Sequence, residues 1–216
     1  MDVEQIAPHL WHWSTQHPDW KPEDRGESGL GWDETVSSYA LVADDALVLI
    51  DPQVPAADEA EAGRFWEALD RDVEGHGPPA ILITIFWHAR SAEEIAARYP
   101  GSAIWAPADA PEGHVRSTHT YSAGDDLPAE IRAHDVGQLG ELVLYLPSHK
   151  AVVFGDVVLD GVRLLPESWL RNDMTRKDVA TALRPLLDEE IDLILLTHGG
   201  PVAKDARQKL ERALEV

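Results

Sequence analysis

Residues 86–91, with the sequence FWHARS, follow directly on an apolar run that is predicted to be a strand. A strand that ends in a histidine-bearing loop just before a helix is a position where many hydrolases hold a catalytic metal. Asp156 and His198 also follow apolar runs. Imidazole and carboxylate groups can ligate a metal or transfer protons. We therefore take His88, Asp156 and His198 as candidate catalytic residues, with Arg90 beside them.

Composition narrows the chemistry and the partners. The chain of 216 residues has 18 basic and 39 acidic side chains, a net charge of −21. The negative electrostatic field of this charge repels phosphate backbones and acidic membrane surfaces. We therefore expect a small-molecule ligand and no nucleic-acid or membrane partner. The absence of cysteine excludes disulfides, a thiol nucleophile and thiolate metal ligands. No signal peptide or membrane-spanning run is visible, which predicts a cytoplasmic protein.

The apolar patterns predict an α+β protein with a single domain over residues 1–216. Predicted strands cover residues 38–43, 46–50, 80–85, 103–105, 141–146, 151–154 and 193–196. Predicted helices cover residues 57–73, 91–99, about 175–187 and about 202–215. Each half of the chain has a hairpin ending in an aspartate, then a helix, then an apolar strand ending near a histidine. This repeated plan predicts two sheets packed face to face with helices outside, and a surface loop over residues 107–128.

In order and spacing these features resemble the metallo-β-lactamase superfamily. The matching segments are Leu49-Ile50-Asp51, the strand before Thr84, Leu146-Pro147 leading into Gly155-Asp156, and Thr197-His198-Gly199-Gly200. The resemblance runs from about Leu10 to the last helix. It implies a four-layer αββα sandwich whose site lies on loops at one edge of the paired sheets.

The family's metal-binding motif, HxHxDH, is only partly present in this chain. Aligned with it, Phe86 takes the place of the first histidine, His88 keeps the second, Arg90 replaces the aspartate and Ser91 the last histidine. A further family histidine falls at about Gly137, with His134 three residues away. Asp156 matches the bridging aspartate and His198 the late histidine.

Coordination chemistry therefore argues against an intact two-metal centre, because catalytic zinc needs three protein ligands besides water. We favour a site without catalytic metal. The alternative is one zinc or manganese ion on His88, Asp156 and His198, with His134 as a further candidate ligand. In the metal-free interpretation the Arg90 guanidinium pairs with Asp156 and replaces the metal's charge; otherwise Arg90 points to solvent.

Other polar and aromatic residues near the motif have competing interpretations. Ser91 could be a nucleophile, but a capping box with Glu94 explains it more simply. Asp51 is predicted to accept hydrogen bonds below the site. In the aromatic segment 11–20, His17 and Trp20 could form the roof of a pocket, whereas Trp11 and Trp13 alternate as core residues of a strand would. Trp87 is a candidate for the core or for the pocket.

Two classes of function remain open. The first is a hydrolase that acts on a small ester, lactone or thioester, without metal or with one metal, with Arg90 holding a substrate anion or carbonyl oxygen. The second is a pseudoenzyme, a non-catalytic module that uses the altered metal-binding site of the family to bind a small molecule or a partner. The fold alone does not choose between them.

Overall fold

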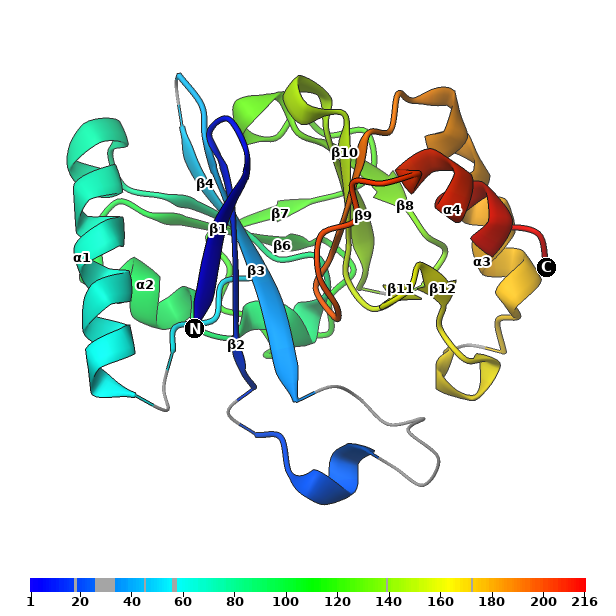
Figure 1. The fold of residues 1–216 in the computed structure, drawn as a ribbon, viewed down its shortest axis with the longest axis horizontal. Coiled ribbons are helices and arrows are strands. Elements are labelled where there is room, and N and C mark those ends of the chain that lie inside the picture. The colour runs from blue at the N-terminus through cyan, green and yellow to red at the C-terminus, as the bar shows by residue number, and fades with distance from the viewer. Residues whose placement is uncertain (18, 26–33, 45, 56–57, 139, 172) are drawn as a thin grey trace.

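Two β-sheets pack face to face and helices cover their outer faces (Figure 1). The computed structural model describes residues 1–17, 19–25, 34–44, 46–55, 58–138, 140–171 and 173–216. This is the layered sandwich that the repeated pattern of the sequence predicts. Within the described ranges, no helix is both long enough and apolar enough to cross a bilayer.

The first sheet has seven strands in sequence order. These are β1 (Asp2–Ala7), β2 (Leu10–Gln16), β3 (Thr35–Val42), β4 (Leu47–Ile50), β5 (Ala80–Leu82), β6 (Ala103–Pro107) and β7 (His119–Tyr121). Strands β1 to β4 pair antiparallel, and β4 to β7 pair parallel. The parallel half matters for function, because the carboxyl ends of parallel strands meet at one edge of a sheet.

The second sheet has four strands in the order β13-β10-β9-β8. They are β8 (Arg132–Asp135), β9 (Leu142–Leu146), β10 (Ala151–Phe154) and β13 (Leu193–Leu196). Strand β10 pairs antiparallel with β9 and parallel with β13. A separate two-stranded hairpin, β11 (Val158–Leu159) and β12 (Arg163–Leu164), follows β10.

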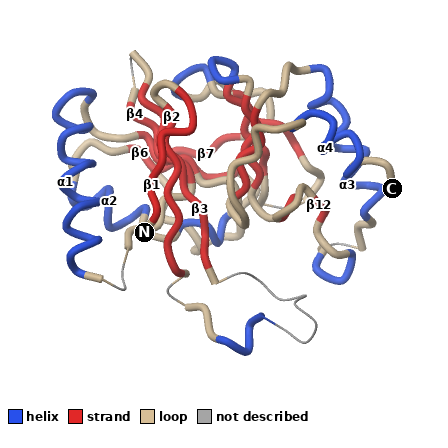
Figure 2. Tube along the Cα trace, viewed as in Figure 1, coloured by secondary structure: helices blue, strands red, loops and turns tan. Residues whose placement is uncertain are grey.

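The helices lie in two pairs on opposite outer faces (Figure 2). Helices α1 (Glu59–His76) and α2 (Ala92–Arg98) cover the first sheet, and α3 (Arg176–Leu183) and α4 (Ala206–Ala213) cover the second. Asp58 caps α1 by accepting from two backbone N–H groups, and Thr175 forms a reciprocal capping box with Asp178 at α3. Each cap satisfies donors that the first helical turn leaves unpaired.

Alternation along the strands divides the core into three apolar layers. In β4, Val48 and Ile50 face the second sheet, whereas Leu47 and Leu49 face α1 and α2. In β10, Val153 lies between the sheets and Phe154 packs toward α3 and α4. Because successive side chains of a strand point to opposite faces, the central strands β4, β9 and β10 are buried on both faces. The strands can therefore hold their end loops in fixed positions.

Some details of the sequence interpretation are wrong. Ser91 makes no side-chain cap at α2, so the capping box with Glu94 is absent. Trp13 is buried as predicted, but Trp11 is 37% exposed. The segment predicted as a loop over residues 107–128 contains β7, whose short length and polar first residues hid it. Strand β1 was missed because four of its six residues are exposed and it shows no apolar alternation.

Candidate functional site

The candidate site lies where four strands end. Asp51 follows β4 and His88 follows β5, in the 3₁₀ turn Phe86–Ala89; Asp156 follows β10 and His198 follows β13. Strand β4 is parallel to β5, and β10 is parallel to β13. Each pair therefore delivers its residues to one edge of its sheet, and the packing of the sheets brings the two edges together.

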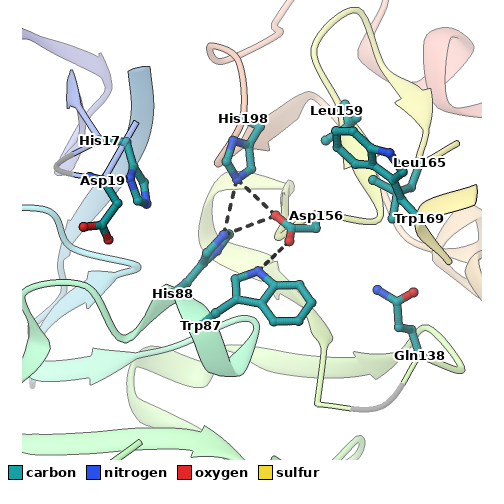
Figure 3. A pocket seen from close by; sticks show the side chains of 10 residues that line it. All are labelled: His17, Asp19, Trp87, His88, Gln138, Asp156, Leu159, Leu165, Trp169 and His198. Carbon is teal, nitrogen blue, oxygen red and sulfur yellow. Dashed lines mark hydrogen bonds and ion pairs between the residues drawn. The ribbon is translucent and has the colours of Figure 1, made fainter. Parts of the chain in front are cut away.

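Three ligand-capable atoms converge at this edge (Figure 3). Asp156 Oδ1 lies 3.2 Å from His88 Nε2 and 3.1 Å from His198 Nε2. The two imidazole Nε2 atoms are 3.3 Å apart. The atoms thus form a nearly equilateral triangle. The structure brings together the three residues that the sequence singles out.

The orientation of His88 is fixed from behind by Asp51. His88 Nδ1 lies 2.9 Å from Asp51 Oδ2, and the Thr84 backbone N–H donates to Asp51 Oδ1 at 2.8 Å. The Thr84 hydroxyl also donates to Asp51. Since a carboxylate only accepts, the His88 ring donates from Nδ1 and turns Nε2 toward Asp156. Asp51 is the hydrogen-bond acceptor below the site that the sequence predicts.

Asp156 is held through both its side chain and its backbone. The Trp87 indole N–H donates to Asp156 Oδ2 at 2.6 Å, which leaves Oδ1 toward the histidines. Glu141 Oε1 accepts from the backbone N–H groups of Asp156 and Val157 at 2.7 and 2.8 Å. Gln138 in turn donates to the other Glu141 oxygen at 2.8 Å. Asp156 therefore has little freedom to turn away.

Sequence reasoning missed Glu141 and Gln138. Glu141 is 1% exposed, although the sequence interpretation treats it only as the first residue of a strand. The signal that could have found it is a single carboxylate at the head of an otherwise apolar run. Glycine at position 155 makes room for this carboxylate, because a Cβ there would lie 3.0 Å from Glu141 Oε1 and 2.8 Å from Thr84 Oγ1.

The opposite charges of Asp156 and His88 stabilise each other's ionised forms. Burial disfavours the ionised form of Asp156, but His88 and His198 outweigh it and hold the pKa of Asp156 well below its usual range. Burial and Arg90 lower the pKa of His88, yet Asp156 and Asp51 outweigh them and raise it. Burial and the charge of Asp156 raise the pKa of Glu141. The triangle therefore combines an ionised carboxylate with an imidazole whose protonated form is favoured.

The predicted ion pair between Arg90 and Asp156 is wrong. Arg90 Nη1 donates instead to the backbone carbonyls of Ser37 and Asp51, at 3.0 and 2.9 Å. In the part of the chain that the structure describes, no carboxylate oxygen lies within 4.0 Å of the guanidinium. The sequence interpretation failed because the carbonyls at the end of β4 and in β3 lie closer to Arg90 than Asp156 does.

The triangle opens into a cavity of about 400 Å³. Its lining residues are His17, Asp19, Trp87, His88, Gln138, Asp156, Leu159, Leu165, Trp169 and His198. His17 is thus on the cavity wall, whereas Trp20 is not among these residues. Burial and Arg90 lower the pKa of His17 to about 4, so its imidazole is neutral at neutral pH.

The remaining sequence candidates lie outside the triangle. Ser91 Oγ accepts from Gln53 Nε2 at 3.2 Å and from the Val54 backbone N–H at 3.0 Å, so it contacts no general base among the described residues. His134, in β8, packs with its ring centroid 6.4 Å from that of Tyr145. Neither residue belongs to the three-residue group that could hold a metal.

The donor set fits one metal ion. In a tetrahedral site with ligand bonds of about 2.0–2.2 Å, ligand atoms are separated by about 3.3–3.6 Å. The triangle edges of 3.1–3.3 Å need to expand by only a few tenths of an ångström. Phe86 adds no ligand to this set, because its ring packs on Trp87 with centroids 4.5 Å apart and has no donor atom.

Comparisons with known proteins agree on the fold. No protein-family model and no curated protein matches the chain. Among solved structures, it is similar to the DIM-1 metallo-β-lactamase exposed to ceftazidime, with 12% identity, a TM-score of 0.70 and coverage of 99% of this chain and 96% of that one. It is also similar to the mono-zinc form of FIM-1 from Pseudomonas aeruginosa, with 15% identity, a TM-score of 0.66 and coverage of 99% of this chain and 94% of that one. The metal-soaked Flv1 flavodiiron core from Synechocystis is similar with 16% identity and a TM-score of 0.70, and the match covers 99% of this chain and 60% of that one.

Proposed function

We propose that this chain, which has the metallo-β-lactamase fold, is a hydrolase that holds a single divalent metal ion on His88, Asp156 and His198 and cleaves a small ester, lactone or thioester. The observation that carries the proposal is the triangle of ligand atoms with edges of 3.1–3.3 Å. The mono-zinc form of FIM-1 is a solved structure of similar fold with one metal. When bound, such an ion supplies a Lewis acid and lowers the pKa of a bound water.

The residues around the triangle prepare it for this task. Asp51 keeps the proton of neutral His88 on Nδ1, so that the Nε2 lone pair faces the site. Trp87 occupies one oxygen of Asp156 and leaves the other to the site. Trp87, Trp169 and Leu165 provide apolar wall around the reacting group, which reduces competition from bulk water.

The proposed metal centre is degenerate rather than dinuclear. Phe86 and Arg90 stand where the family motif has a histidine and an aspartate, and a guanidinium repels a second cation. Burial lowers the pKa of Arg90, while the charges of Asp51 and Asp156 oppose that shift. Arg90 therefore contributes a fixed positive charge in place of a second ion, held by backbone carbonyls rather than by an ion pair.

A non-catalytic binding module is the rival function. The observation that favours it is that His88, Asp156 and His198 already contact one another at 3.1–3.3 Å. If His88 is protonated, the cluster is stable as ion pairs and needs no metal. The rival predicts a ligand pocket without turnover.

Metal stoichiometry and turnover together separate these functions. The protein, stripped with chelator and then loaded with zinc or manganese, is analysed for metal by mass spectrometry and assayed on nitrophenyl esters, γ-lactones and acyl thioesters. We expect one ion per chain, hydrolysis that chelator abolishes and metal restores, and loss of both in His198→Ala. His134→Ala is the matched control, because His134 is a half-buried histidine outside the triangle.

Other outcomes contradict the proposal in distinct ways. Two ions per chain would show that further ligands exist. Hydrolysis that survives chelator but is lost in Asp156→Ala would indicate metal-free catalysis. Absence of both metal and turnover would favour the binding module.

A further inference from the structure

A second cavity of about 360 Å³ adjoins the triangle. It shares His17, Asp19 and Trp87 with the first cavity, and its remaining lining residues are Gln53, Arg90 and Ser91. In Figure 3, His17 and Asp19 lie across the triangle from Leu159, Leu165 and Trp169. A ligand with its reactive group at the triangle can therefore reach a polar cavity on one side and an apolar wall on the other.

Arg90 lines this polar cavity, and its guanidinium has one unused edge. Arg90 Nη1 is held by two backbone carbonyls, but Nε and Nη2 are buried and have no hydrogen-bond partner among the described residues. These two nitrogens carry parallel N–H groups on the same edge of the guanidinium. That edge is the one that binds a carboxylate through two hydrogen bonds.

Leaving these donors unpaired is costly. A buried donor without a partner is destabilising, and more so when it is charged. The Arg90 backbone also has a φ of 39° and a ψ of −118°, a strained region that favours glycine. An arginine held in a strained conformation with an unsatisfied edge points to a partner that binds there.

Ser91 adds a neutral donor beside Arg90. Its Oγ accepts two hydrogen bonds, from Gln53 Nε2 and from the Val54 backbone N–H. A hydroxyl whose oxygen is saturated in this way can still donate its own proton. Among the described residues no acceptor takes that proton, so it is available to an anion in the cavity.

The charges that oppose an anion here do not block the edge. Asp51 accepts from Thr84 and lies beside His88, and Asp156 lies between the two histidines. Asp19 is the carboxylate on the cavity wall itself, and it is exposed to solvent. Exposure screens its repulsion far more than burial screens the attraction of Arg90.

We infer that the Nε–Nη2 edge of Arg90 and the Ser91 hydroxyl form a carboxylate subsite, so that the substrate is an ester, thioester or lactone with a carboxylate at one end and an apolar group at the other. The carboxylate lies in the polar cavity, the apolar group packs on Leu159, Leu165 and Trp169, and the carbonyl lies at the triangle. The assignment of the carbonyl rests on the proposed hydrolase function; the carboxylate subsite does not.

Binding of a matched acid and amide tests the subsite. Titration calorimetry of the purified full chain with 3-phenylpropionate and with 3-phenylpropionamide is done in chelator, so that the acid cannot bind through a metal. We expect the acid to bind at least about tenfold more tightly, since charge-assisted hydrogen bonds are about twice as strong as neutral ones. Arg90→Gln should abolish this preference, and Arg90→Lys should keep only part of it. Arg64→Gln is the control, because Arg64 is an exposed arginine of α1.

Each result bears on the inference even if Arg90→Gln does not fold. The preference of the unaltered protein needs no variant, and Ser91→Ala should reduce it about two- to fivefold through loss of one hydrogen bond. Equal affinity for acid and amide, no binding of either at millimolar concentration, or a preference that persists in Arg90→Gln would overturn the subsite. Acid preference without turnover of any ester would contradict the hydrolase alone, whereas turnover of neutral esters without acid preference would contradict only the subsite.

Discussion

The two sheets contribute to the site in different ways. The loops after β10 and β13 supply Asp156 and His198 to the triangle, whereas the loop after β5 supplies only His88 and also carries Phe86 and Arg90. Yet the β5 side is the better braced, since Asp51 and Thr84 fix His88 while His198 Nδ1 is buried without a partner among the described residues. The comparison teaches that one side of a site can supply most of the candidate ligands while the other orients its single histidine most firmly.

The largest effect is expected where the two sides meet. Asp156 contacts both histidines, so Asp156→Ala removes the only oxygen ligand of the triangle. We expect metal affinity and hydrolysis to fall at least about 100-fold, because loss of even an outer partner of a ligand costs about 10–100-fold. Competition with a chromogenic chelator measures the affinity. Retention of stoichiometric metal in this variant would contradict the triangle.

The bracing of the β5 side predicts the next effect. Asp51→Asn replaces one acceptor oxygen by an amide donor, so either His88 Nδ1–H or a Thr84 donor loses its partner. Metal affinity should fall about 10–100-fold through His88. On the other side, His198 Nδ1 has no such partner to lose among the described residues. If Asp51→Asn left metal affinity unchanged, the orientation of His88 would not depend on its carboxylate partner.

Glu141 tests whether the second sheet positions Asp156 through the backbone. Glu141→Ala leaves the buried N–H groups of Asp156 and Val157 without an acceptor. We expect the free energy of unfolding to fall by about 2 kcal/mol or more, as unsatisfied buried donors cost about 1–3 kcal/mol each. Urea denaturation measures it. Glu93→Ala, at an exposed residue of α2, is the control and should change stability far less.

The smallest effect concerns His17, which lines the cavity at the triangle. Its pKa is about 4 in the folded protein against an ordinary 6.5, so the unfolded chain binds more protons between these values. Stability linked to His17 is therefore present above pH 6.5 and lost as the pH falls toward 4. His17→Gln should flatten this part of the pH profile of the urea midpoint. An unchanged slope would show that His17 titrates normally.

Much of the fold follows from the sequence, because apolar alternation and chain order together determine a sandwich of two sheets. Residues such as Val48 and Leu49, which face opposite layers, carry that information locally. The triangle was also foreseeable, since His88, Asp156 and His198 each end a predicted strand. The partners of Arg90 and Glu141 were not, because they are set by backbone atoms of distant strands. Sequence spacing says which side chains share an edge, but not which carbonyl or N–H lies nearest.

The most direct test is a crystal structure of the zinc-loaded protein, with an anomalous difference map calculated from data collected at the X-ray absorption edge of zinc. The account predicts one ion per chain, about 2.0–2.2 Å from His88 Nε2, Asp156 Oδ1 and His198 Nε2, with the Arg90 guanidinium still on the carbonyls of Ser37 and Asp51. A map with no ion at the triangle, or with a second ion beside Arg90, would contradict it.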